Sequence, residues 1–233
     1  MNNENAGFSG PLSATHKGPS LGVLALVYVV LFAASLVVMI LLTHAAPMPM
    51  PFGDASSSRL YYLQFQDALR INAFLQFGSC IPLGIFTASI TSRLKFLGLN
   101  NSGVQIALFG GMAASIFLVI SSVSSWVQSQ PGISNGIGTM RVVQLLGFIT
   151  GGMAHVAFFG LLLAGISITA RFAKLIPAWL FWLGMITAAF AELCTLSMVF
   201  PAFSVLIPLG RFPGFIWMII IGFNLPVVRK LSN

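Results

Sequence analysis

The sequence predicts an all-α fold, a polytopic membrane protein built as a bundle of six transmembrane helices. Composition gives two reasons: 57% of the 233 residues are hydrophobic and only 6% are charged, whereas soluble domains contain about 25% charged residues. The third reason is a series of apolar segments that each match a hydrocarbon core of about 30 Å at about 1.5 Å per helical residue. Together these observations exclude a soluble globular domain.

The first transmembrane helix is expected at residues 21–42, which form an uncharged apolar run. This run is longer than the apolar core of a cleavable signal peptide, about 7–15 residues, so we expect it to be retained. Residues 1–20 precede it and are rich in Asn, Gly, Ser and Pro without an apolar period. They predict a disordered cytoplasmic tail.

The long connection at residues 43–70 changes character halfway. Its first half, "APMPMPFG", contains closely spaced prolines, which cannot donate backbone hydrogen bonds and therefore favour an extended chain. Its second half, "SSSRLYYLQFQDALR", carries aromatic and leucine side chains that are typical of a short helix at a membrane interface. We therefore expect an external loop with one interfacial helix.

Further apolar segments complete one transmembrane domain at residues 21–228, followed by a cytoplasmic tail at 229–233. Small residues recur four positions apart in "GGMAAS" and "GFITGG" of the third and fourth segments, which predicts that these two helices touch. We expect the other five helices at residues 71–90, 104–127, 142–170, 176–200 and 211–228.

The distribution of Lys and Arg predicts the orientation of the bundle. With the N-terminus in the cytoplasm, seven of the 11 basic residues lie in cytoplasmic segments and four lie outside. Cytoplasmic connections carry an excess of Lys and Arg, so we expect both termini in the cytoplasm and residues 43–70 and 128–141 outside. The formal net charge of +7 is scattered over helix ends and forms no patch, so we expect no nucleic-acid partner.

Sequence motifs for catalysis do not occur in a usable context. A literal G-x-S-x-G pattern at residues 132–136 lies in a polar loop between two membrane segments, whereas a nucleophile elbow needs a strand-to-helix turn. Phosphate-binding, dinucleotide-binding and zinc-protease motifs are absent. Three histidines and four carboxylates do not form a ligand set. We therefore expect no catalytic residues, no metal site and no cofactor.

Polar side chains in four of the predicted helices form what we call the intramembrane polar cluster. Counted at about 1.5 Å per residue from the cytoplasmic helix ends, four of them lie about 22–26 Å above the cytoplasmic boundary. The cytoplasmic halves of the helices are nearly all apolar, so the polar content gathers in the outer half. The cluster comprises Glu192, Arg211, His155, Gln76, Arg141 and Gln144.

Glu192 lies inside the apolar run "ITAAFAELCTLSMVF". An ionisable side chain at membrane depth costs at least about 2.5–3.5 kcal/mol unless it faces the interior and finds a partner. Arg211 is the first candidate partner and His155 is the second, since both are counted to the same level. The sequence leaves open whether such a pair only fixes helix register or forms a binding or proton-transfer site.

Three segments, "RLKFLGLNNSGVQIALFGG", "LIPAWLFWLGMITAAFAELCTLS" and "IPLGRFPGFIWMIIIGFNLP", resemble an uncharacterised class of bacterial multi-pass inner-membrane proteins, of the kind described as domains of unknown function. The resemblance covers about residues 70–228 and is one of general pattern. It implies the bacterial cytoplasmic membrane, and it transfers no activity and no site residues.

The leading functional hypothesis is a non-enzymatic membrane protein, transporter-like or accessory, whose polar cluster binds a small molecule or a partner membrane subunit within the lipid bilayer. One alternative is an intramembrane enzyme that uses His155 and Glu192 as acid and base. Another alternative is a structural subunit of a larger membrane complex.

Overall fold

The computed structural model of the protein describes residues 13–230. Six helical spans in this part of the chain are long and apolar enough to cross a membrane, which confirms an all-α, multi-pass membrane protein. Three spans are single helices: α1 (Leu21–Leu42), α3 (Gln66–Phe96) and α4 (Ser102–Gln128). The fourth span joins α5 (Ile137–Phe148), the π-helix η2 (Ile149–Ala154) and α6 (His155–Phe172). The last two join α7 (Ala178–Leu193) to η3 (Cys194–Met198) and η4 (Pro201–Val205) to α8 (Leu206–Asn224).

The spans agree with the predicted segments in number and order, but several of their ends differ. α3 is longer than the predicted 71–90 because Asp67 at one end and Arg93 at the other lie within the helix. α8 begins before Arg211, since this charge lies inside the helix and does not mark its end. It stops at Asn224 because the next residue is extended, as the position before a proline favours.

The connection between α1 and α3 contains the short helix α2 (Ala55–Gln64), where the sequence predicted one. Asp54 caps its start, because the carboxylate accepts hydrogen bonds from the backbone N–H and the hydroxyl of Ser57 at 2.7 and 2.8 Å. The same hydrogen bonds hold the pKa of the Asp54 carboxyl below its usual value. The position of α2 at a membrane interface stays a prediction.

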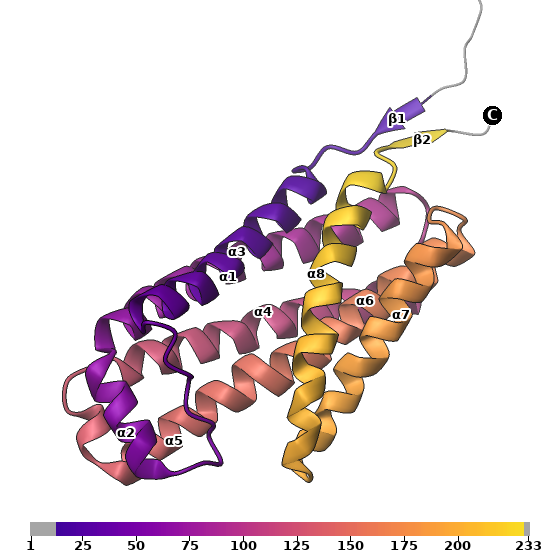
Figure 1. The fold of residues 1–233 in the computed structure, drawn as a ribbon. Coiled ribbons are helices and arrows are strands. Elements are labelled where there is room, and N and C mark those ends of the chain that lie inside the picture. The colour runs from indigo at the N-terminus through magenta and orange to yellow at the C-terminus, as the bar shows by residue number, and fades with distance from the viewer. Residues whose placement is uncertain (1–12, 231–233) are drawn as a thin grey trace, which may run out of the picture.

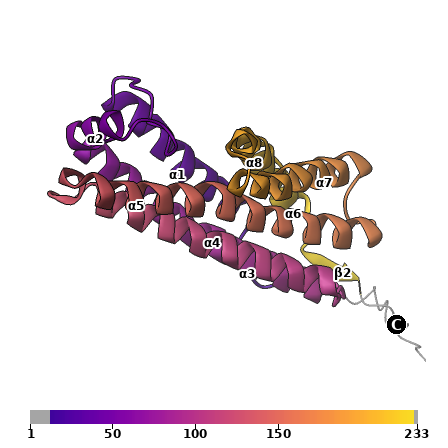
Figure 2. The same ribbon diagram turned by 90° about the horizontal axis from the view of Figure 1, so that it is seen from below.

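α4 packs against both α3 and α6, and small residues make these contacts close. A Cβ atom added to Gly110 would lie 2.6 Å from Leu161 Cβ and 2.7 Å from the backbone nitrogen of Leu162. The predicted contact between the third and fourth spans is thereby confirmed. α1 packs on α3, and α7 packs on α6 and α8 (Figures 1 and 2).

α1 and α8 touch at one end of the bundle and diverge toward the other (Figure 1). At the contact, a Cβ atom on Gly222 would lie 2.9 Å from Gly22 Cα, so neither position has room for a side chain. Further along, Phe215 packs edge to face with Tyr28 and Phe32, with ring centroids 5.1 and 5.2 Å apart. Beyond these rings the two helices separate.

A two-stranded antiparallel ribbon joins the two described ends of the chain, β1 (Ser13–Thr15) and β2 (Val228–Lys230). We call the end of the bundle that carries this ribbon proximal and the opposite end distal (Figure 1). The predicted disordered tail therefore contains a strand at residues 13–15. Residues 1–12 of that tail and residues 231–233 lie outside the described part of the chain.

His16 fastens the ribbon to the proximal end of α3. Its Nε2 atom lies 3.2 Å from the hydroxyl of Ser92, and its ring packs on Phe96 with centroids 5.4 Å apart. Arg229 donates to the backbone carbonyl of Phe96 at 3.2 Å. Burial, together with the charge of Arg93, lowers the pKa of His16 below 6.5. The contacts of His16 are therefore most stable when its imidazole is neutral.

Candidate functional site

A cavity of about 720 Å³ lies in the distal half of the bundle, within the range of about 300–1,000 Å³ that is typical of small-molecule sites. α1, α3, α4, the α5–η2 segment and α8 form its walls, and the extended segment after α1 covers it. Its polar lining consists of Thr43, Tyr61, Tyr62, Asn72, Gln76, Ser121, Ser124, Ser125, Gln128, Gln144 and Arg211.

The π-helix η2 interrupts the fourth span at this cavity. Wider i→i+5 turns displace backbone carbonyls from the α-helical pattern, and such insertions occur frequently at functional sites. Here the carbonyl of Gly151 accepts a hydrogen bond from Arg211, and that of Gly147, just before η2, accepts one from the Ser121 hydroxyl at 2.9 Å. Gly147 and Gly151 both line the cavity, so the irregular turn and the residue before it use two backbone carbonyls to hold Arg211 and Ser121 at its wall.

Arg211 lies inside α8 and lines the same cavity. Besides its hydrogen bond to Gly151, its guanidinium carbon lies 5.2 Å from the centroid of the Phe32 ring. Its Nε atom is buried and has no hydrogen-bond partner among residues 13–230. A carbonyl dipole and an aromatic face both attract a cation, but neither carries a full negative charge.

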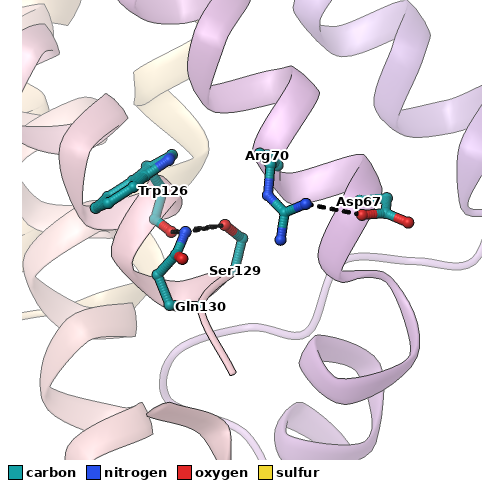
Figure 3. A network of polar contacts seen from close by, with 5 residues as sticks. All are labelled: Asp67, Arg70, Trp126, Ser129 and Gln130. Atoms are coloured by element: carbon teal, nitrogen blue, oxygen red, sulfur yellow. Dashed lines mark hydrogen bonds and ion pairs between the residues drawn. The ribbon is translucent and has the colours of Figure 1, made fainter. Parts of the chain in front are cut away.

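The expected ion pair between Arg211 and Glu192 does not form. The one ion pair between described residues is Arg70–Asp67, at 3.2 Å near the distal end of α3 (Figure 3). Glu192 is exposed on α7, and its Oε1 atom lies 3.4 Å from the place that a Cβ on Gly160 of α6 would occupy. The prediction counted depth along each helix and did not fix the direction in which the side chain points.

The neighbours of Glu192 explain why it faces outward. Ala191 and Cys194, three residues apart, are both fully buried, and they pack in one cluster with Val156. Residues three or four apart share a helix face, so this face of α7 is the one turned to the bundle. Glu192, one residue away from Ala191, points about 100° away from it. It lies outside the cavity.

His155 lies at the start of α6 and is fully buried. Its Nδ1 atom is 2.9 Å from the backbone carbonyl of Ala114, and its Nε2 atom is 3.3 Å from the hydroxyl of Tyr28. A carbonyl can only accept, so Nδ1 carries the hydrogen and Nε2 accepts from Tyr28. These two contacts tie α6 to α1 and α4. His155 does not line the cavity.

Arg141 and Gln144 fasten the cover of the cavity to α5. The amide nitrogen of Gln144 donates to the carbonyl of Pro49 at 3.2 Å, while its oxygen accepts from Arg141 at 3.1 Å. Arg141 also donates to the carbonyl of Gly53. Pro49 is one of three prolines at the cavity, with Pro47 and Pro51. Gln144 therefore belongs to the cavity wall, and Arg141 positions the segment above it.

Amide side chains from α3 and α4 form another part of the cavity wall. Gln76 lines the cavity, as do Asn72 and Gln128. The side-chain oxygens of Asn72 and Gln128 are buried without a hydrogen-bond partner among residues 13–230. Unpaired buried polar groups are uncommon in folded proteins, and together with Arg211 Nε three of them belong to residues of one cavity.

Tyr62 of α2 adds a phenol to the cavity wall. Burial raises its pKa to about 12, so the hydroxyl is neutral at physiological pH and can serve as donor or acceptor.

Sequence reasoning placed Gln76, Gln144 and Arg211 in the polar cluster, and the structure brings these three to one cavity. It missed the contribution of α2 and of the proline-rich segment. Their signal was present in the sequence: a run of tyrosines and prolines directly after a membrane segment has to fold back over the bundle or extend away from it. Nothing local distinguishes these two outcomes.

The fold and the cavity define the class of protein as a polytopic α-helical membrane protein with a ligand-sized distal cavity. Comparison of the chain with models of protein families, with curated proteins and with solved structures finds no match.

Proposed function

We propose that this chain is a non-enzymatic, multi-pass membrane protein, transporter-like or accessory in type, that binds a small molecule in its distal cavity. The cavity itself is the observation that supports this proposal. Its volume of about 720 Å³ suits a small organic molecule. It joins apolar walls to a few polar groups, three of which have unpartnered buried atoms within residues 13–230: Asn72, Gln128 and Arg211.

The proposed location is the bacterial cytoplasmic membrane, with both termini on the cytoplasmic side. Six spans and the pairing of β1 with β2 support placing both described ends on one side of the membrane. The excess of Lys and Arg near the proximal end of the bundle supports placing that end on the cytoplasmic side. In this orientation the distal cavity lies in the outer half of the membrane and is covered by the segment that precedes α2.

Binding is favoured over acid–base catalysis by the surroundings of the two residues that catalysis would need. Both ring nitrogens of His155 are hydrogen-bonded to neutral groups. Glu192 is exposed on α7 and shares no hydrogen bond with His155 in the described structure. A general base needs to lie within hydrogen-bond reach of the proton that it takes up, and neither residue lines the cavity.

Copurification tests the proposal directly. The protein is purified from native membranes in a mild detergent, and bound small molecules are identified by mass spectrometry. Ser125→Phe places a ring in the cavity, whereas Ile116→Phe on the same helix changes an exposed position, 58% accessible. We expect a compound that is retained by the wild type and Ile116→Phe and lost from Ser125→Phe.

Thermal stability gives the second measurement. Adding the identified compound to purified protein should raise the Tm of the wild type and of Ile116→Phe, because a ligand that binds only the folded state stabilises it. Ser125→Phe should not respond. Equal retention and equal Tm shifts in all three proteins would contradict a site in this cavity.

A further inference from the structure

We infer that the molecule bound in the distal cavity is an amphipathic organic anion, with an oxyanion head on Arg211 and an apolar body along α1; this rests on the proposed binding function. Oxyanion here means a carboxylate or a phosphate ester, which an arginine recognises through the same fork of N–H donors. Four observations lead to this class of ligand.

The first observation is a missing counter-charge. An arginine stays protonated in proteins, so Arg211 brings a full positive charge to the cavity. The three carboxylates in the described part of the chain are placed elsewhere: Asp54 caps α2, Asp67 pairs with Arg70, and Glu192 is exposed on α7. None of the cavity-lining residues is Asp or Glu.

The second observation is the state of the guanidinium itself. It has five N–H donors in one plane, and a backbone carbonyl, that of Gly151, accepts from it. The Nε–H group is buried without a partner in the described structure, and the Phe32 ring covers one face of the plane. Arg211 lines the cavity, so an oxyanion there can accept hydrogen bonds from it on two different oxygens and neutralise its charge. A hydroxyl offers one uncharged oxygen, and a cation cannot accept.

The third observation concerns the wall that would hold the rest of the molecule. Leu36 and Met39 of α1, Leu118 of α4 and Ile207 of α8 line the same cavity as Arg211. These side chains offer no hydrogen bond, so they favour an apolar body over a second charged group. A small inorganic anion would leave most of this volume unfilled.

The fourth observation is that the cavity wall continues onto the surface. Ile40 and Met48 line the cavity and are also 58% and 53% exposed. They lie at the distal end of α1 and in the segment after it, where α1 has separated from α8 (Figure 1). An apolar body longer than the cavity can leave at this point along α1 and remain in hydrocarbon. The proposed ligand thus has its charge inside and its apolar end toward the membrane.

A set of four probes with the same ten-carbon chain tests the charge requirement: decanoate, monodecyl phosphate, 1-decanol and decylammonium. Each is titrated against the full chain in nanodiscs of zwitterionic lipid, and the rise in Tm gives an apparent Kd. We expect decanoate or monodecyl phosphate to bind more tightly than 1-decanol, and decylammonium to cause no shift. The two anionic arms distinguish a carboxylate site from a phosphate-ester site.

Substitution of Arg211 provides a second, independent test. Arg211→Gln should weaken binding of the anion by about thirtyfold or more, which is the usual effect of removing one partner of a buried charged hydrogen bond. Binding of 1-decanol should change by less than about twofold. Arg70→Gln is the matched control, since it removes an arginine that does not line this cavity and should leave both affinities unchanged. If Arg211→Gln fails to fold, Arg211→Lys keeps the charge without the fork and should bind the anion with intermediate affinity.

The outcomes separate this inference from the proposed function. Equal affinities for decanoate and 1-decanol, both unaffected by Arg211→Gln or Arg211→Lys but lost in Ser125→Phe, would overturn the anion while the cavity keeps its function. Tighter binding of decylammonium than of the two anionic probes would likewise overturn the proposed anionic ligand. Tm shifts that Ser125→Phe does not reduce would contradict both. If none of the four probes shifts the Tm, the amphipathic anion is overturned, and the copurified compound alone decides whether the cavity binds a ligand.

Discussion

Replacing Arg211 and Glu192, singly and together, should show that they do not interact. The variants are Arg211→Met, Glu192→Gln and the double substitution. Each side chain has its own surroundings, with Arg211 on the Gly151 carbonyl and the Phe32 ring and Glu192 at the surface of α7. The changes in unfolding free energy at independent sites are additive to within about 0.3–0.5 kcal/mol. We therefore expect a coupling energy between Arg211 and Glu192 no larger than this.

The structure also gives a magnitude for Arg211→Met alone. The change removes a charged hydrogen bond to Gly151, worth about 1.5–3 kcal/mol, and a cation–π contact with Phe32, worth about 0.5–2 kcal/mol. It also removes a cation whose burial at membrane depth costs at least about 2.5–3.5 kcal/mol. These contributions nearly cancel, so we expect the unliganded protein to change in stability by no more than about 2.5 kcal/mol in either direction.

Unfolding in mixed micelles, followed by circular dichroism as the fraction of denaturing detergent rises, measures these free energies. The same preparation without added ligand serves for all four proteins. A buried ion pair would give a different pattern: a loss of about 3–5 kcal/mol for Arg211→Met that the double substitution largely recovers. A coupling energy above about 1 kcal/mol would therefore refute the separation of the two side chains.

Three further predictions concern the topology, the packing and the ribbon. Reporter fusions after Ser57 and after Asn233 should report opposite sides of the membrane, and the same side for both would contradict six spans. Gly110→Ala should destabilise the protein by about 1–3 kcal/mol, because the added methyl meets backbone atoms at 2.7 Å. Gly78→Ala, whose Cβ would have its nearest neighbour at 3.9 Å, should cost nothing in the same melting assay. The lowered pKa of His16 means that folding disfavours its proton, so protection of the ribbon from hydrogen exchange should be full above about pH 6.5 and fall at lower pH. His16→Asn should remove this pH dependence, and an unchanged dependence would show that His16 is not its cause.

Sequence reasoning predicted the elements of this fold better than the relations between them. Apolar length and the absence of charge decide whether a segment spans a membrane, so α1 was predicted with both of its ends. Charges near helix ends were harder to interpret. Arg211 was taken as the start of the last span, but it lies within α8 because the bundle offers it Gly151 and Phe32.

The candidate site was predicted only in part, because sequence shows where a residue lies along a helix but not which way its side chain points. The polar content of the outer helix halves placed Gln76 and Gln144 in the intramembrane polar cluster, and both line the cavity. The partner of Glu192 could not be predicted in this way, since depth along a helix says nothing of rotation about its axis. Only the burial of Ala191 and Cys194 reveals which face of α7 is turned inward. The π-helix had no local sequence signal beyond the glycines of "GFITGG".

The ribbon between β1 and β2 indicates which part of the molecule forms late in folding. Ser13 pairs with Lys230, so these hydrogen bonds connect positions separated by nearly the whole length of the described chain. They can form only after α8 has been synthesised, because β2 follows α8 in the chain. Contacts of such long sequence separation carry the largest entropy of loop closure, and the ribbon is therefore among the last parts of the molecule to become ordered during synthesis. The ribbon thus fastens the two described ends of the chain to each other after the helices between them have formed.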